Sequence, residues 1–426
     1  MSSATTLHQQ VAEILTSLVG PWTKEAYAAV AITAVVVAWV FWSINEQPTK
    51  VRLVFNASSK LNQFVSTNCA TLQSTYHPPW WAKSAHVQAL LTVALPQAKI
   101  KFSRDLVGLQ DGGHVAVDWC EGTSQLSTDA PILLVIHGLN GSSDEHRSFC
   151  ADALQAGFRP VVFNKRGHGG STVAAVPLLQ AFGCVKDVTE AIDHIERKFP
   201  TAPIVGVGFS AGGGLVCSYL GETGKASKLK AGVLVSPSTF LSDVQPLYTC
   251  IAYHLDLALG HNTEDLFCGG GMNAGYDAVL TFALKRFLRQ HKEHLSPVID
   301  YPAAMRSRSV AEFDRHVYVK MHGYEDLASY WKHNDPLRAV ENIAVPVLCI
   351  NAKDDPVCTY GQIDLALFDK NPIGLMAITK YGSHCGFFEQ TSWFQLKSWA
   401  SKATLDYLTT TLRYLDSSSA TSSLSE

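Results

Sequence analysis

The segment Gly208-Phe-Ser-Ala-Gly212 decides how the rest of the sequence is interpreted. An apolar run, residues 204–207, precedes it, and a segment typical of a helix follows it. In a Gly-x-Ser-x-Gly turn between a strand and a helix, the serine adopts a strained conformation, and the two glycines leave room for the neighbouring backbone. The pattern therefore predicts that Ser210 is an exposed nucleophile, provided that the surrounding strands and partner residues exist.

The composition is that of a folded protein. Of the 426 residues, 47% are hydrophobic and 17% are charged, and this length has room for one large α/β domain with attached segments. The formal net charge of −3 provides no broad electrostatic attraction for nucleic acid. We therefore expect no nucleic-acid partner, and the composition gives no indication of the oligomeric state.

The cysteines are scattered, without a Cys-x-x-Cys pair or the histidine spacing of a zinc site. We therefore expect thiols in a reducing compartment and no metal. No cofactor is expected either, because the glycine run from Cys268 to Gly271 lacks the preceding strand and the following Lys-Ser/Thr pair of a phosphate-binding loop. The ten cysteines are Cys69, Cys120, Cys150, Cys184, Cys217, Cys250, Cys268, Cys349, Cys358 and Cys385.

Residues 26–44 form an uncharged stretch of 19 residues that is rich in Ala and Val. This length spans the hydrocarbon core of a bilayer, so the stretch predicts a transmembrane helix and makes the bilayer a partner. Lys24 precedes the stretch, whereas Lys50, Arg52 and Lys60 follow it. By the positive-inside rule, this asymmetry favours a single-pass membrane protein whose catalytic domain is cytosolic.

The two ends of the chain differ from the rest. Residues 1–25 carry apolar side chains at helical spacing between Leu7 and Leu18, which predicts an amphipathic segment. Residues 416–426 are rich in Ser and lack apolar periodicity, which predicts a disordered tail. The folded domain is expected over residues 60–415.

Within this domain, short apolar runs alternate with helical patterns. Several runs are continuous stretches of Val, Ile and Leu, as in strands that are buried on both faces of a parallel sheet. Apolar residues at steps of three and four between Val185 and Ile195 predict one of the crossover helices that parallel strands require. We therefore expect a mostly parallel central sheet with helices on both faces. The expected strands are 115–119, 132–137, 160–164, 204–209, 232–236, 347–351 and 375–379.

The strand pattern stops between residues 237 and 341. Helix-like segments, such as Ala278 to His291, take its place. An insertion between two strands of such a sheet is expected to cover the carboxyl ends of the strands, where ligands bind. The sequence therefore predicts a helical cap over about residues 237–341.

A serine nucleophile needs a base, and the base needs an acid that orients it. On sheets of this kind the chain order is serine, acid, histidine, with the last two behind late strands. Strand 375–379 leads into His384, the expected base. Strand 347–351 leads into Asp354 and Asp355, of which only one can easily face the histidine. We expect Asp355, whose Asp-Pro-Val sequence resembles the turn usual at this acid, and Asp354 remains the alternative.

The negative oxygen that forms when a serine attacks a carbonyl needs preorganised N–H donors. The backbone N–H of Ala211, next after the nucleophile, is expected to supply one donor of this oxyanion hole. Leu139, in the loop after strand 132–137, is expected to supply the other. Arg166 and His168 lie in a glycine-containing segment and are expected to support a loop beside the site.

Six groups of motifs between Tyr76 and Gln390 complete the pattern. They are Pro79-Trp80 with His86-Val-Gln88, Asp111-Gly-Gly113 with Asp118-Trp119, His137-Gly-Leu-Asn-Gly-Ser-Ser143, Asn164 to Ser171, Gly208-Phe-Ser-Ala-Gly-Gly213 and Asn351-Ala-Lys-Asp-Asp-Pro356. With them, the chain resembles the membrane-anchored AB hydrolase 4 family of the α/β-hydrolase superfamily. One departure is Ser383, where the family often has glycine. The resemblance implies an α/β-hydrolase fold and serine-hydrolase chemistry on carboxylic esters.

We therefore expect a membrane-anchored serine hydrolase of the carboxylesterase, lipase or phospholipase type. Its substrate would be a lipid or medium-chain ester, cleaved by Ser210, His384 and Asp355 through an acyl-enzyme. An acyltransferase that passes a medium-chain acyl group to an alcohol or lysolipid is the alternative, because a triad does not distinguish water from another acceptor. A noncatalytic binding protein on the same fold is a remote alternative, since nucleophile, base and acid are all present.

Overall fold

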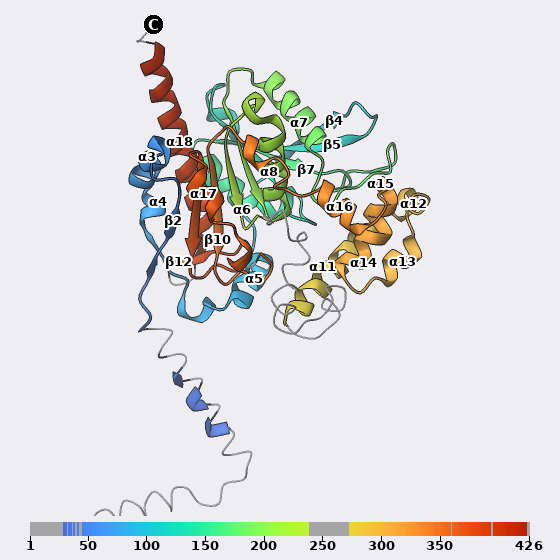
Figure 1. The fold of residues 1–426 in the computed structure, drawn as a ribbon, viewed down its shortest axis with the longest axis horizontal. Helices are drawn as coiled ribbons and strands as arrows, with labels where there is room; N and C mark the ends of the chain where they lie inside the picture. The colour runs from blue at the N-terminus through green and yellow to red at the C-terminus, as the bar shows by residue number, and fades with distance from the viewer. Residues whose placement is uncertain are drawn as a thin grey trace, which may run out of the picture. The chain divides into compact units, whose positions relative to one another are not determined.

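The computed structural model describes residues 29–31, 33–35, 37, 38, 41, 45–237, 272–358, 360–392 and 395–423 (Figure 1). The chain divides into two compact units, Met1–Gln47 and Pro48–Glu426. The second unit contains the fold. It begins before residue 60, where the domain was expected to start, because a short strand at residues 52–54 already belongs to the main sheet.

The predicted amphipathic segment, residues 1–25, lies outside the described residues, and so does much of the predicted transmembrane helix, residues 26–44. Within the described part of the chain, no helix combines the length and the apolar character needed to cross a membrane. The transmembrane helix therefore stays a prediction from the sequence.

A nine-stranded sheet forms the centre of the second unit. The six strands in its middle run parallel, and antiparallel pairs add β2 at one edge and β5 and β4 at the other. Because the middle strands are parallel, their carboxyl ends lie along one edge of the sheet. The order across the sheet is β2 (Arg52–Val54), β11 (Gly374–Thr379), β10 (Val347–Ala352), β9 (Leu229–Val235), β8 (Ile204–Phe209), β6 (Ile132–Ile136), β7 (Arg159–Asn164), β5 (His114–Cys120) and β4 (Phe102–Gly108).

All seven predicted strands are present, as β5 to β11, which confirms the mostly parallel sheet. Strands β2 and β4 were not predicted. Both are edge strands, and β4 is largely exposed, so neither has the continuous apolar run that marks the central strands. Two further antiparallel pairs are small: β1 (Thr49–Lys50) with β3 (Thr75–Tyr76), and β12 (Phe388–Ser392) with β13 (Gln395–Ser398).

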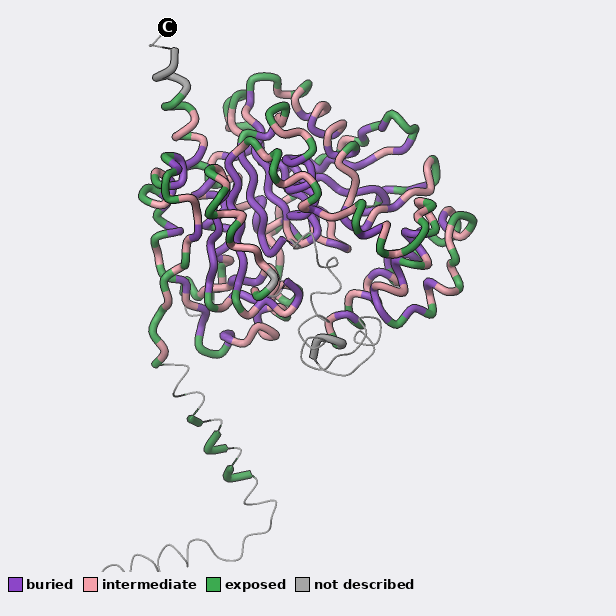
Figure 2. Tube along the Cα trace, viewed as in Figure 1, coloured by how far each residue is buried: buried purple, intermediate pink, exposed green. Residues whose placement is uncertain are grey.

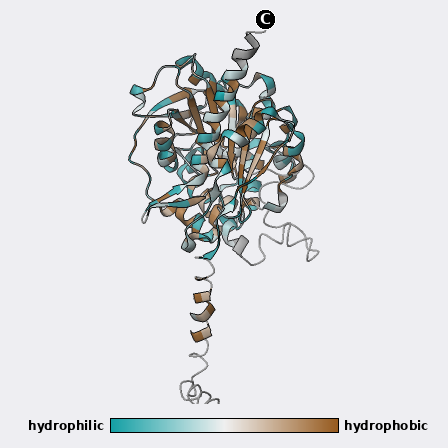
Figure 3. Cartoon of the chain, turned by 90° about the vertical axis from the view of Figure 1, so that its left-hand side faces the viewer, coloured by the Kyte–Doolittle hydropathy of each residue, from teal (hydrophilic) through white to brown (hydrophobic). Residues whose placement is uncertain are grey.

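Helices cover both faces of the sheet. Leu133 and Val135 of β6 point into one core cluster, whereas Leu134 and Ile136 point into the other, as strand alternation requires. The buried strands stand out in the tube of Figure 2 and as the apolar centre of Figure 3. The first cluster is covered by α3 (Lys60–Asn68), α4 (Ala70–Gln73), α6 (Arg147–Gln155) and α18 (Trp399–Ser423), and the second by α7 (Val185–Lys198), α8 (Ala211–Thr223) and α17 (Ala366–Lys370).

The predicted cap is helical where the structure describes it, from residue 272 onward, while residues 238–271 lie outside the described ranges. A third core cluster joins the cap helices to the loops at the carboxyl ends of the strands, and it includes Leu139 and Ala211. The cap therefore packs against the loops that were predicted to build the site. Its helices are α11 (Met272–Gln290), α12 (Lys292–Leu295), α13 (Tyr301–Arg306), α14 (Val310–Asp314), the π-helical turn Arg315–Val319, α15 (Lys320–His322) and α16 (Leu327–His333).

The C-terminal segment differs from its prediction. A disordered tail was expected from residue 416, but helix α18 continues to Ser423, and only residues 424–426 lie beyond the described part. The first half of α18 is anchored in the core through residues such as Trp399 and Tyr407. Once a helix is nucleated, each further residue adds a hydrogen bond at low cost, so the polar segment continues it.

The Gly212→Ala variant should lower the free energy of unfolding by about 3 kcal/mol or more, because the added methyl group would lie 2.2 Å from the backbone oxygen of Ile136. The matched control is Gly275→Ala on helix α11, where no atom of the described residues lies within 4 Å of the added atom. This control should change the free energy by less than about 1 kcal/mol, in the stabilising direction. Urea titration of both variants measures the difference, and equal stabilities would contradict the close approach at Gly212.

Candidate active site

Three side chains from different strand ends meet at the carboxyl edge of the sheet. Ser210 directly follows β8, Asp355 follows β10, and His384 lies in the loop after β11. His384 Nε2 is 2.8 Å from Ser210 Oγ, and His384 Nδ1 is 3.0 and 3.2 Å from the two carboxylate oxygens of Asp355. The structure thus brings together the serine, the histidine and the preferred one of the two candidate acids.

Ser210 has the strained backbone that its glycine-flanked turn predicts. Its φ of 53° and ψ of −121° are unusual for a residue with a side chain, and its N–H donates to Val235 O at 2.9 Å. A methyl group on Gly208 would lie 2.2 Å from the backbone oxygen of Gly212, so no larger residue fits at Gly208. Helix α8 begins at Ala211, immediately after the serine.

The two neighbouring aspartates have different partners. Asp355 Oδ1 accepts the backbone N–H groups of Val357 and Cys358, each at 2.8 Å, and these bonds fix the carboxylate against His384. Asp354 instead accepts the N–H of Ser383 at 3.0 Å, on the histidine loop itself. Burial raises the pKa of Asp354 to about 6; the hydrogen bond from Ser383 opposes this shift, and the charge of Asp355 adds to it.

The loop that carries His384 is itself strained. Ser383, Cys385 and Phe387 all have φ between 53° and 63°, a region that residues with side chains rarely adopt. Polar contacts hold it on both sides of the histidine, since Ser236 Oγ accepts the N–H of Cys385 at 3.1 Å and Gln88 Oε1 accepts that of Phe388 at 2.8 Å. Phe387 is fully buried near Tyr76 and Trp399.

Buried side chains also hold the loop after β6. Lys165 donates to the carbonyl oxygens of Gly138 at 3.0 Å, Ala181 at 3.1 Å and Leu139 at 3.4 Å, and His168 Nε2 lies 3.1 Å from Leu139 O. Burial lowers the pKa of Lys165 to about 7 and that of His168 to about 3. A supporting role was predicted for His168 but not for Lys165, whose only signal in the sequence is its place in the Asn164 to Ser171 motif.

These contacts orient the two N–H groups that were predicted to bind an oxyanion. In a planar trans peptide, the C=O of one residue and the N–H of the next point in opposite directions. Gly138 O faces Lys165, so the N–H of Leu139 points away from that side chain. Ser210 O accepts bonds from residues 213 and 214 within helix α8, so the N–H of Ala211 points away from the helix. A Cβ on Gly138 would lie 4.0 Å from Ser210 Oγ, which places this loop beside the hydroxyl.

Arg166 supports the scaffold through ion pairs with two carboxylates. It pairs with Asp187 at the start of α7 at 2.6 Å and with Asp111 in the β4–β5 turn at 2.7 Å. The loop-supporting role predicted for Arg166 agrees with these contacts.

A buried network behind the loop after β6 connects other motif residues. Asp118 accepts hydrogen bonds from Ser143 Oγ at 2.6 Å and Asn164 Nδ2 at 2.9 Å, and it pairs with Arg104 at 2.6 Å. Asn164 Oδ1 in turn accepts the N–H of Ser143 at 3.0 Å. These bonds fix the end of the segment His137–Ser143, which contains Leu139.

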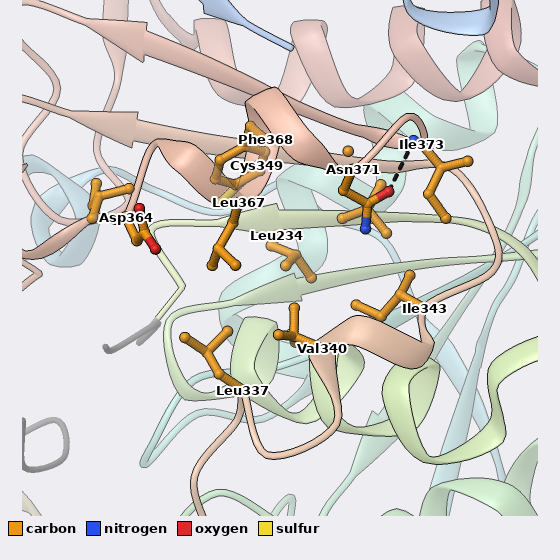
Figure 4. A pocket seen from close by; sticks show the side chains of 14 residues that line it. Leu234, Leu337, Val340, Ile343, Cys349, Asp364, Leu367, Phe368, Asn371 and Ile373 are labelled. Atoms are coloured by element: carbon orange, nitrogen blue, oxygen red, sulfur yellow. Dashed lines mark hydrogen bonds between the residues drawn. The ribbon is translucent and has the colours of Figure 1, made fainter. Parts of the chain in front are cut away.

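A separate apolar cavity lies between β9, β10, β11 and α17 (Figure 4). Leu234, Phe368 and Ile343 are among its lining residues, and none of Ser210, Asp355 and His384 is. Its volume of about 60 Å³ holds a few water molecules but no acyl chain. We therefore do not assign the substrate to this cavity.

Comparison with known proteins adds the family. A family model described as Hydrolase_4, serine aminopeptidase, S33, matches residues 128–390, which is more than half of the chain. Protein ABHD15 of Homo sapiens is 30% identical over 345 residues, covering 77% of this chain and 67% of that protein.

Two further relatives carry names that state an activity. Phospholipase ABHD3 of Mus musculus is 26% identical over 367 residues, covering 83% of this chain and 82% of that protein. Monoacylglycerol lipase ABHD2 of Danio rerio is 26% identical over 395 residues, covering 88% of this chain and 90% of that protein. With the family model matching across the strands that carry Ser210, Asp355 and His384, the chain belongs to the AB hydrolase 4 family of the α/β-hydrolase superfamily.

Proposed function

We propose that this protein is a serine hydrolase that cleaves carboxylic esters of lipid-like substrates through an acyl-enzyme. One observation carries the proposal: the imidazole of His384 connects the hydroxyl of Ser210 to the carboxylate of Asp355 by contacts of 2.8 and 3.0 Å. Geometry of this kind lets a histidine take the proton of a serine while a carboxylate holds the ring. Membership in a hydrolase family supports the same chemistry.

The proposed reaction has two stages. Ser210 Oγ attacks the ester carbonyl while His384 Nε2 takes its proton and then passes it to the leaving alcohol. Water, activated by the same nitrogen, then hydrolyses the acyl-enzyme and restores the serine. Asp355 keeps the proton of the neutral ring on Nδ1, so that Nε2 presents its lone pair to Ser210.

In the proposed transition state, the carbonyl oxygen becomes negative and accepts the N–H groups of Leu139 and Ala211. Both groups are held before substrate arrives, because the carbonyls of the same peptide planes are already bonded to Lys165 and to helix α8. Donors that need no rearrangement stabilise developing charge most effectively.

Lipid-like substrates are proposed for two reasons. The relatives named phospholipase and monoacylglycerol lipase act on lipids by their names. In addition, helix α5 (Ala85–Ala94) contacts the loop that carries His384 through the hydrogen bond between Gln88 and Phe388. On this helix, the side chains of Leu90 and Val93 are 66% and 85% exposed. Exposed apolar side chains next to a site favour contact with lipid. The proposed transmembrane helix at residues 26–44, with the catalytic domain on the cytosolic side, would place the enzyme beside its substrate.

The Ser210→Ala variant should lose labelling by a fluorophosphonate probe and should lower the turnover of a medium-chain p-nitrophenyl ester by at least about 10³-fold, because it removes the nucleophile. The matched control is Ser218→Ala, which changes a buried serine on helix α8 whose hydroxyl accepts a hydrogen bond from Arg338 at 2.9 Å. The control should keep both labelling and turnover. Labelling of the Ser210→Ala variant at the wild-type level would contradict the assignment.

Asp355→Asn should reduce kcat by about 10³–10⁴-fold, because the amide favours the wrong tautomer of His384. Asp354→Asn should reduce kcat by less than about tenfold, since an amide oxygen can still accept the N–H of Ser383. Steady-state kinetics on the same ester compare the two variants. A larger loss for Asp354→Asn would reverse the assignment of the acid.

The raised pKa of Asp354 predicts a pH-dependent stability. Because the folded pKa of about 6 exceeds the ordinary value of 3.8, the unfolded chain releases this proton at lower pH than the folded chain. The contribution of Asp354 to stability is therefore complete below about pH 4 and is lost as pH rises through about 6. Relative to Asp354→Asn, the wild-type free energy of unfolding should fall by at most about 3 kcal/mol over this range. Urea titrations from pH 4 to 7 test this, and a constant difference between the proteins would contradict it.

A further inference from the structure

Beside the triad lies a cluster of three different metal-binding groups. A carboxylate oxygen of Asp355, a ring nitrogen of His384 and Sγ of Cys358 all lie within 4.8 Å of one another. Among the residues that the structure describes, this is the one group of three or more His, Cys, Asp or Glu side chains so placed. Cys358 follows Asp355 by three residues, and its N–H donates to Asp355 Oδ1, which keeps the thiol next to the carboxylate.

The ring nitrogen that faces this cluster is Nδ1, because it lies 3.0 Å from Asp355 Oδ2 while Nε2 contacts Ser210. Thiolate sulfur, imidazole nitrogen and carboxylate oxygen are the three ligand types that Zn²⁺ takes in proteins, at about 2.0–2.3 Å each. A sulfur ligand disfavours Mg²⁺ and Ca²⁺, which prefer oxygen. Three protein ligands would leave a fourth position for water.

The three groups are close to a coordinating arrangement. Ligand atoms of a tetrahedral zinc ion lie about 3.5 Å from each other. The distance between Asp355 and His384 is already shorter than this, so the remaining adjustment falls on the thiol. Cys358 Sγ lies 3.7 Å from Ser236 O, a weak contact that zinc binding would exchange for a metal–thiolate bond.

We propose that Zn²⁺ binds to Asp355, Cys358 and His384 Nδ1 and thereby reversibly inhibits the enzyme; the inhibitory part rests on the proposed function. Zinc replaces the proton on Nδ1, and the neutral imidazole then carries its single proton on Nε2. The thiol proton of Cys358 goes to solvent. Nε2 has lost the lone pair that would accept the proton of Ser210, and the charge of Asp355 is engaged by the metal. The nucleophile is therefore no longer activated.

Binding is tested first without any reliance on activity. Co²⁺, which substitutes for Zn²⁺, is titrated into the full-length Ser210→Ala variant, and the near-ultraviolet absorption of a cobalt–thiolate bond is recorded. One equivalent should produce this band, and Zn²⁺ should abolish it. Adding Cys358→Ala should remove the band, whereas Cys184→Ala, which deletes a partly exposed thiol outside the cluster, should leave it. A band that survives Cys358→Ala, or its absence from the parent variant, would overturn the site.

Inhibition is tested on the enzyme with Ser210 intact. Zn²⁺ should reduce ester turnover at least about tenfold at concentrations that saturate the cobalt site, and a chelator should restore it. The zinc concentration for half-inhibition should rise at least about tenfold in Cys358→Ala, each protein being compared with its own zinc-free rate. Equal sensitivity of both proteins would overturn the inhibitory role. Absence of any ester turnover would instead contradict the proposed function, while the cobalt band would still report the metal site.

Discussion

At Gly212, the backbone of helix α8 passes so close to the end of strand β6 that a single methyl group would lie 2.2 Å from a carbonyl oxygen. A methyl group on Gly208 would likewise lie 2.2 Å from the backbone oxygen of Gly212. Between these two close approaches, Ser210 has a positive φ, and its hydroxyl faces His384. The close approach at Gly212 also brings the start of α8 next to the loop after β6, so that N–H groups from two backbone segments can donate to one atom of a substrate.

Strain at Ser210 is matched by strain at the other strand ends. Ser236 after β9 has a φ of 44°, and three residues of the histidine loop have similar values. Conformations of this kind cost on the order of 1–3 kcal/mol each and persist only where the surroundings determine them. Here the surroundings are the fully buried strands and the polar contacts from Asp354, Ser236 and Gln88. The rigid sheet is what allows the loops to keep these conformations.

The sequence was sufficient to predict the central strands and the three side chains that meet, because both depend on local patterns. Buried parallel strands such as β6 are continuous apolar runs, and His384 stands behind the last of them. The exposed edge strand β4 has no such run, and the ordered end of α18 depends on a packed helix before it. The role of Lys165 in holding the loop after β6 could not be predicted from the sequence, since lysine is seldom fully buried and only the fold shows the carbonyl groups that surround it.

The proposed metal-binding role of Cys358 could not be predicted from the sequence either. Metal motifs are read from fixed spacings, but here His384 comes 29 residues after Asp355 and belongs to another strand end. Only the parallel sheet brings these two loops together.

The burial of Lys165 has an energetic cost, but it stabilises the loop that serves the proposed reaction. Burying a cation is costly, and burial lowers the pKa of Lys165 to about 7. It nevertheless satisfies three carbonyl groups, which fixes the peptide planes of the loop after β6. The N–H groups of Leu139 and Ala211 belong to peptide planes whose carbonyl groups are bonded to Lys165 and within helix α8. In the proposed reaction, an oxyanion at Ser210 would accept both N–H groups without any rearrangement of the loop, so the scaffold favours the transition state over the resting site.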